Sequence, residues 1–126
     1  MTSQLSAALR AAAAGIHPDE AAAGLIISHG TFLHRDDFTG RFIEYGASSG
    51  TTMAAIDWDA VITALHVGEL PCSAGERRVL MLSASLAGGI PVDLRDAATG
   101  LDDRNIQRLV TAILHASGKR PDPERY

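Results

Sequence analysis

Apolar residues recur with helical spacing over most of the 126-residue chain. Side chains that repeat every three or four residues share one face of an α-helix, and that face packs on a core. The two clearest stripes are Trp58, Val61, Ile62 and Leu65, and then Ile106, Leu109, Val110, Ile113 and Leu114. No alternating pattern of useful length indicates a strand. The sequence therefore predicts an all-α fold, a bundle of six to seven helices.

Capping residues and glycines set the expected helix boundaries. Asp57, the capping box Ser73–Glu76 and either Asp102 or Asp103 stand where helices should begin. The predicted helices cover residues 3–15, 19–34, 36–45, 57–67, 74–87, 93–98 and 103–117. Gly24 and Gly30 weaken the second of these, unless they let another helix approach closely.

One glycine- and serine-rich segment divides the chain. Residues 46–52 read GASSGTT, and such residues favour an irregular loop over a helix. We expect a single helical domain over 1–118, made of N-terminal helices in 1–45 and a C-terminal bundle in 56–118. The polar, proline-containing tail 119–126 is expected to be disordered.

Composition restricts the compartment and the partners. The formal net charge is −4, which disfavours a general nucleic-acid coat. The single cysteine, Cys72, cannot form an internal disulfide, and no apolar run is long enough to span a membrane. The first residues lack the basic start of a signal peptide. We expect a cytoplasmic protein without membrane contact. Its alanine and arginine usage indicates a GC-rich, bacterial genome.

The segment 94–113 has the character of a helix-turn-helix. It reads LRDAATGLDDRNIQRLVTAI, a short helix, a glycine turn and a longer helix. Arg104, Gln107 and Arg108 would then lie on the outer face, and these residue types read guanine and adenine. Asp96 stands where a small residue normally packs, and Asp102 and Asp103 would face phosphates. The alternative is a plain helical hairpin with a solvated arginine face.

Other residues suggest chemistry without requiring it. His29 and His34 lie close to acidic residues, but their spacing of five does not place two ligands on one helix face. Cys72 precedes a helix start, where the helix dipole would lower the pKa of a thiol. Neither feature fixes a reaction, so we assign no catalytic residue, no metal ligand and no cofactor.

The N-terminal helices are rich in small residues and suit close packing on another chain. We expect a homodimer, with an interface formed by Leu5, Leu9, Phe32, Phe38 and Phe42. The predicted function is a protein–protein interaction or regulatory module without evident chemistry, rather than an enzyme. The alternative is a DNA-binding regulator that uses the segment 94–113, and a small enzyme or metal-binding protein is the remote third.

Overall fold

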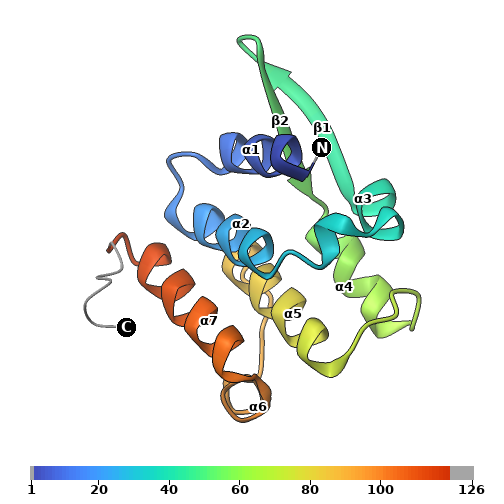
Figure 1. Cartoon of the computed structure of the whole chain (residues 1–126), viewed down its shortest axis with the longest axis vertical. Coiled ribbons are helices and arrows are strands. Elements are labelled where there is room, and N and C mark those ends of the chain that lie inside the picture. Colours follow the sequence, from blue (N-terminus) through green and yellow to red (C-terminus); the bar gives the residue numbers. More distant parts are fainter. Residues whose placement is uncertain (1, 120–126) are drawn as a thin grey trace.

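The computed structural model describes residues 2–119, which are mostly helical (Figure 1). These residues form seven α-helices, one short 3-10 helix and a two-stranded sheet. In chain order the elements are α1 (Thr2–Ala13), α2 (His17–His29), η1 (Phe32–His34), α3 (Asp36–Phe42), β1 (Ile43–Ser48), β2 (Thr51–Ile56), α4 (Trp58–His66), α5 (Ala74–Gly88), α6 (Leu94–Gly100) and α7 (Asp103–Ala116). The helical prediction is confirmed in its main part, and the sheet is an addition to it. Of the tail 119–126, residues 120–126 lie outside the described part of the chain.

The helix starts of the C-terminal half follow the capping residues in the sequence. Asp57 accepts a hydrogen bond from the Ala60 amide at 3.1 Å, and Asp102 begins α7 in the same way. Ser73 and Glu76 form the complete capping box, because each side chain accepts from the other residue's amide. These contacts satisfy amides that would otherwise have no partner in the first turn of a helix.

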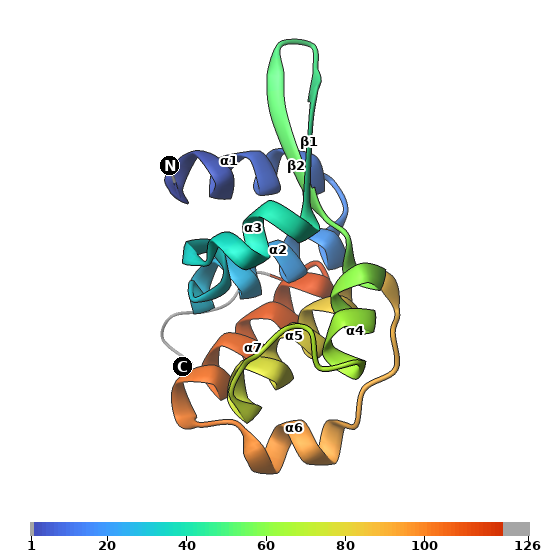
Figure 2. The same cartoon turned by 90° about the vertical axis from the view of Figure 1, so that its right-hand side faces the viewer.

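The loop expected over residues 46–52 is wrong in most of its length, because residues 46–48 and 51–52 belong to the two strands of a β-hairpin. β1 and β2 pair antiparallel, with Ile43 opposite Ile56 and Ser48 opposite Thr51. Ser49 and Gly50 form the two-residue connection and have φ angles of 51° and 80°. Positive φ at both central residues gives the turn that matches the right-handed twist of paired strands. The helix expected over 36–45 therefore ends at Phe42, and the hairpin projects beyond α1 (Figures 1 and 2).

The helix expected over 19–34 is also divided. α2 ends at His29, and Gly30 follows with a φ of 83°, a conformation that glycine adopts without steric cost. The chain then forms the separate turn η1, which brings Phe32 into the core. The glycine that lowered the helical signal is thus a true helix end.

Two clusters of buried side chains form the core, and α2 contributes to both. The first cluster joins α1, α2, η1, α3, β2, α4 and α5 around Phe32, Phe38 and Phe42. Successive rings of these three residues are tilted against each other at centroid distances of 5.2 and 5.3 Å. The second joins α2 and α5 to α6 and α7 through residues such as Leu25 and Leu109. α6 crosses the lower end of the molecule beneath α5 and α7 (Figure 2). None of the described helices combines the length and apolar character needed to cross a membrane.

The five residues expected at a dimer interface lie inside this core. Leu5, Leu9, Phe32, Phe38 and Phe42 are between 0% and 7% exposed in the isolated chain. α1 packs its small and leucine-bearing face against α2 and β2. The chain's own core thus accounts for these apolar side chains, and they offer no exposed contact surface.

Candidate functional site

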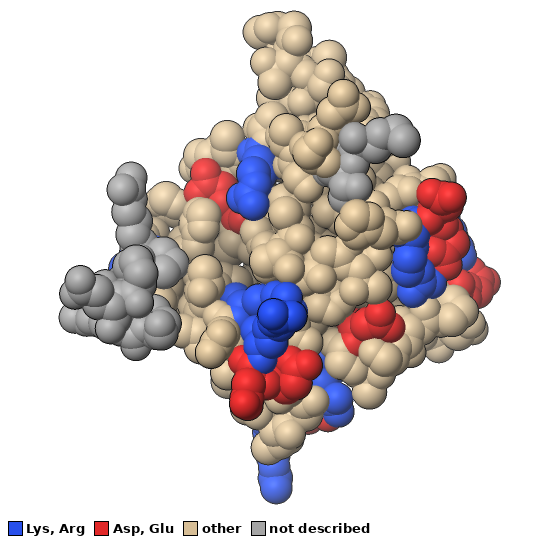
Figure 3. All heavy atoms as spheres, in the orientation of Figure 1, with Lys and Arg blue, Asp and Glu red and all other residues tan. Residues whose placement is uncertain are grey.

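The side chains of α2 and α7 enclose a groove of about 490 Å³ that also receives Arg10 from α1. Its floor contains small and apolar residues, namely Ala21, Gly24, Leu25 and Ala112. Its rim is polar and basic, with Arg10, Ser28, Arg104, Gln107, Arg108, Thr111 and His115. Figure 3 shows basic side chains gathered in the middle of this face, with acidic side chains directly beside them. The groove therefore combines an apolar base with a cationic edge.

The groove is deep at Gly24, because glycine has no side chain to fill the space above α2. A Cβ added there would meet no atom within 4 Å. Gly24 therefore does not serve the close approach of another helix, as the sequence suggested it could. It leaves open space between Leu25, which is 2% exposed, and the side chains of α7.

The three residues expected to read DNA meet in this groove. Arg104 and Gln107 are exposed, and Arg108 is half-buried. The buried side chain of Asn105 accepts a hydrogen bond from Arg108 at 2.8 Å and so fixes the direction of that guanidinium. Within residues 2–119, no carboxylate lies in salt-bridge contact with Arg104 or Arg108. Their charge is therefore available to a ligand.

The segment 94–113 forms two helices joined by a turn, but α7 does not stand free. It packs along α2, so that Arg104, Gln107 and Arg108 border a groove. Asp96 lies on α6, where its carboxylate binds Arg78 of α5 through two hydrogen bonds of 2.9 and 3.2 Å. This pair explains an acidic residue at the position where a helix-turn-helix normally has a small one.

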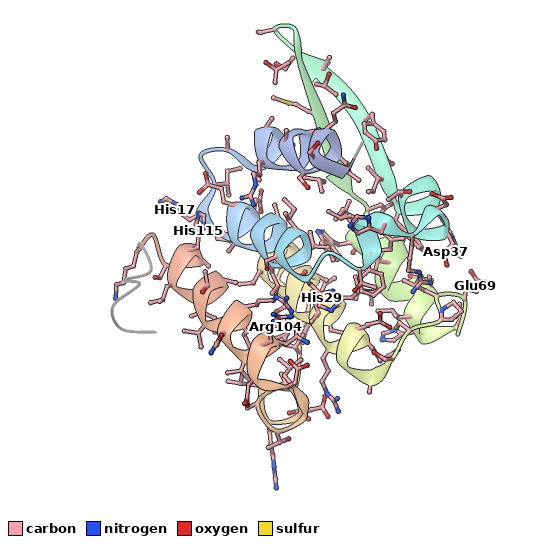
Figure 4. All side chains as sticks on the ribbon, in the orientation of Figure 1. His17, His29, Asp37, Glu69, Arg104 and His115 are labelled. Atoms are coloured by element: carbon pink, nitrogen blue, oxygen red, sulfur yellow. The ribbon has the colours of Figure 1, made fainter. Side chains whose placement is uncertain are left out.

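A cluster of ionisable side chains lies where α2 begins and α7 ends. The carboxylate oxygen Oε1 of Glu20 is 3.3 Å from His17 Nδ1 and 3.0 Å from His115 Nε2. The other oxygen, Oε2, accepts a hydrogen bond from the Gly15 amide at 3.1 Å. Figure 4 shows His17 and His115 side by side at this corner of the molecule. His115 also lines the groove, so the cluster stands at one end of it.

The Glu20 carboxylate is strongly favoured over its protonated form. Hydrogen bonds from His115, Gly15 and His17, in that order of importance, lower the pKa of Glu20 to about 2. The cluster thus holds a full negative charge between two imidazoles. It is also the one group of histidine, cysteine and acidic side chains within residues 2–119 whose ligand atoms are close enough to hold a metal ion.

The sequence contained only part of this signal. His17 and Glu20 are three residues apart, a spacing that places both on one face of a helix, but this stretch was interpreted only as a helix start. His115 is 95 residues further along the chain from Glu20 and reaches it only through the packing of α7 on α2. Arg10 joins the groove for the same kind of tertiary reason.

The residues that the sequence suggested for chemistry, His29, His34 and Cys72, do not form a common site. His34 is exposed on η1, whereas burial, the largest effect, lowers the pKa of His29 at the end of α2. Cys72 is half-buried against the first core cluster, and burial raises the pKa of its thiol. The expected lowering by the helix dipole is therefore wrong, because desolvation of the thiolate outweighs it.

Comparison with known proteins does not assign a function to the groove or to the histidine–glutamate cluster. No protein-family model, curated protein or solved structure matches the chain. The groove and the histidine–glutamate cluster are therefore interpreted from their own geometry and charge.

Proposed function

We propose that the protein is an interaction or regulatory module of the cytosol that binds an acidic segment of a partner protein along the groove between α2 and α7. One observation carries this proposal. The groove has arginines on its rim that lack a carboxylate partner within residues 2–119, although the chain has a net charge of −4. Acidic side chains of a partner would supply the missing partners.

The shape of the groove favours a peptide over a duplex. Its floor is apolar and recessed at Gly24, which suits one or two apolar side chains of a bound segment. Glutamate or aspartate beside them would reach Arg104 and Arg108, and bidentate arginine–carboxylate pairs would fix the orientation. The proposed module has no chemistry of its own, because binding of this kind requires only complementarity.

DNA binding is the alternative, and exposed Arg104 and Gln107 on one face of α7 favour it. Two acidic residues oppose it. Asp102 and Asp103 stand at the start of the same helix, where phosphates would approach. A duplex would also have to be read by a helix that is flanked by α2. We therefore treat DNA as an outcome that the experiment must separate.

A homodimer remains a proposal on a different surface from the one expected. The hairpin projects from the helices, and residues 45–56 carry no charged side chain. Uncharged strand edges pair readily with other strands. Light scattering on the purified chain should give twice the monomer mass if the hairpins associate, and a Thr52→Lys substitution should restore the monomer.

Selection from a random peptide library would test the acidic-segment proposal without knowledge of the partner. The wild-type chain should be the bait, and the Arg104→Glu variant should remove peptides that bind elsewhere. The enriched peptides should combine aspartate or glutamate with apolar residues. Enrichment of neutral or basic peptides would contradict the proposal.

The affinity of an enriched peptide should then be measured by fluorescence anisotropy, with a DNA duplex titrated in parallel. Arg104→Glu should weaken peptide binding by about tenfold or more, because it places like charge at the groove. Arg95→Glu is the matched control, since it makes the same charge change on α6, outside the groove. Equal losses in both variants would show a nonspecific charge effect. Duplex binding that depends on Arg104 would favour the DNA alternative instead.

A further inference from the structure

The donor atoms of the histidine–glutamate cluster are spaced like the ligands of a metal ion. Zinc–nitrogen and zinc–oxygen bonds of about 2.0–2.1 Å place neighbouring tetrahedral ligands about 3.3 Å apart. Glu20 Oε1 lies 3.3 Å from His17 Nδ1 and 3.0 Å from His115 Nε2, which are distances of this size. The ligand atoms of all three residues lie within 4.8 Å of one another.

The chemistry of the donors selects the class of ion. Two imidazole nitrogens and one carboxylate oxygen suit zinc and the neighbouring divalent transition metals, whereas magnesium and calcium prefer oxygen ligands alone. Three protein ligands leave a fourth position for water or for a group of a bound partner. We propose that His17, Glu20 and His115 bind one divalent transition-metal ion, with zinc as the expected ion.

Neighbouring backbone orients one of the three ligands and lies close to a second. The Gly15 amide holds Glu20 Oε2, which leaves Oε1 directed between the two rings. Gly118 follows the end of α7 and lies so close to His17 that an added Cβ would stand 3.3 Å from the ring carbon Cδ2. Contacts of this kind around metal ligands fix their direction and strengthen binding. Asp19, the nearest other acid in sequence, lines a hollow on another side and does not join the set.

Binding of a metal ion would change which ring nitrogens of the cluster carry protons. His17 Nδ1 and His115 Nε2 both donate to the same carboxylate oxygen. When these nitrogens bind a metal ion, each neutral imidazole would instead carry its single proton on its other ring nitrogen.

Calorimetric titration of the untagged full chain with zinc chloride would test the site. We expect one equivalent of zinc to bind with a dissociation constant near or below about 10 μM. His17→Ala and His115→Ala should each weaken binding by about tenfold or more. His34→Ala is the matched control, because it removes an exposed histidine that belongs to no such cluster. Binding in this control should equal that of the wild type.

A conservative variant separates metal binding from a structural ion pair. Glu20→Gln keeps a side-chain oxygen near Gly15 and the histidines but removes the charge that a metal requires. Zinc should raise the melting temperature of the wild type by about 5–10 °C at saturating concentration and leave that of the variant unchanged. Circular dichroism would confirm that the variant is folded.

Two results would overturn the proposal. One is the absence of zinc binding by the folded wild type up to about 1 mM, and the other is equal binding by the wild type and the His17 and His115 variants. The metal proposal and the peptide proposal fail separately. His17 does not line the groove, and Arg104 is not part of the metal cluster.

Discussion

Two hollows within residues 2–119 are bordered by arginine, and they differ in the partners of Arg78 and Arg104. The hollow between α5 and α6, of about 360 Å³, is lined by Arg77, Arg78 and Asp96. Arg77 donates to the Leu65 carbonyl at 3.2 Å, and Arg78 pairs with Asp96. The two form a bidentate pair, and Arg78 also donates to the Gly100 carbonyl at 3.3 Å. In the groove between α2 and α7, by contrast, Arg104 has no such carboxylate among the described residues.

This difference separates a structural arginine from one that is available for binding. The pair in the first hollow joins two helices, and a Cβ added at Gly100 would stand 2.3 Å from Arg78 Cζ, so that the guanidinium would have to move from its present position. A partner that entered this hollow would have to compete with Asp96. The rim of the α2–α7 groove has no internal competitor of that kind, so an incoming carboxylate would gain the full interaction.

The largest expected effect is a loss of stability when the leucine beneath either hollow is shortened, and in this respect the two hollows are alike. Leu25 lies under the groove and Leu82 under the other hollow, and they are 2% and 6% exposed. Leu25→Ala and Leu82→Ala should each lower the free energy of unfolding by about 2–4 kcal/mol, because each leaves a cavity in the same core cluster. Urea denaturation would measure both losses. A loss below about 1 kcal/mol at either position would show that its floor is not part of the core.

The C-terminal half shows how much of the fold local signals can predict. Asp57, Ser73 and Asp102 each begin a helix as their sequence context indicates, because capping depends only on residues three or four apart. The hairpin was missed because its strands contain several alanines and a central Gly46, which are poor strand formers. The serine and glycine at 49 and 50 did carry the turn signal, but their left-handed conformation becomes informative only once two strands are assumed.

Local sequence spacing predicted one part of the candidate site, and tertiary packing determines the rest. Gln107 and Arg108 follow Arg104 by three and four residues on one helix, so periodicity predicted that they share a face. Arg10 lies in the same groove only because three helices pack together, and no sequence spacing encodes that packing. The reach of His115 to Glu20 is likewise a consequence of that packing.

An effect of intermediate size is expected for Glu20 at the His115 end of the groove, where its carboxylate accepts three hydrogen bonds. The pKa of Glu20 is lowered from 4.5 to about 2, so the folded state binds this proton less readily than the unfolded state. The stability that Glu20 contributes is therefore complete above about pH 4.5 and is lost as the pH falls towards 2. Glu20→Gln should reduce the slope of stability against pH in that window.

Urea unfolding at several pH values would test this expectation. Glu44→Gln is the control, because it removes an exposed carboxylate that makes no hydrogen bond within the described residues, and it should keep the wild-type slope. Some slope should persist in Glu20→Gln, since the pKa values of Asp37, Glu76 and Asp96 are also lowered by their partners. An unchanged slope in Glu20→Gln would mean that the ion cluster does not persist in solution.

The smallest effect on stability is expected from Gln107→Glu. This variant also tests directly whether Arg104 differs from Arg78 because it lacks a carboxylate partner. This change keeps the size of the side chain and places a carboxylate three residues after Arg104 on the same face of α7. It should pair with Arg104, as Asp96 pairs with Arg78, and add about 0.2–0.5 kcal/mol to stability. Acidic peptides selected on the wild type should then bind about three- to tenfold more weakly. Gln107→Met, which also keeps the length of the side chain but adds no charge, should retain most of the affinity. If both variants bind equally well, the shape of the groove and not its free positive charge determines what it holds.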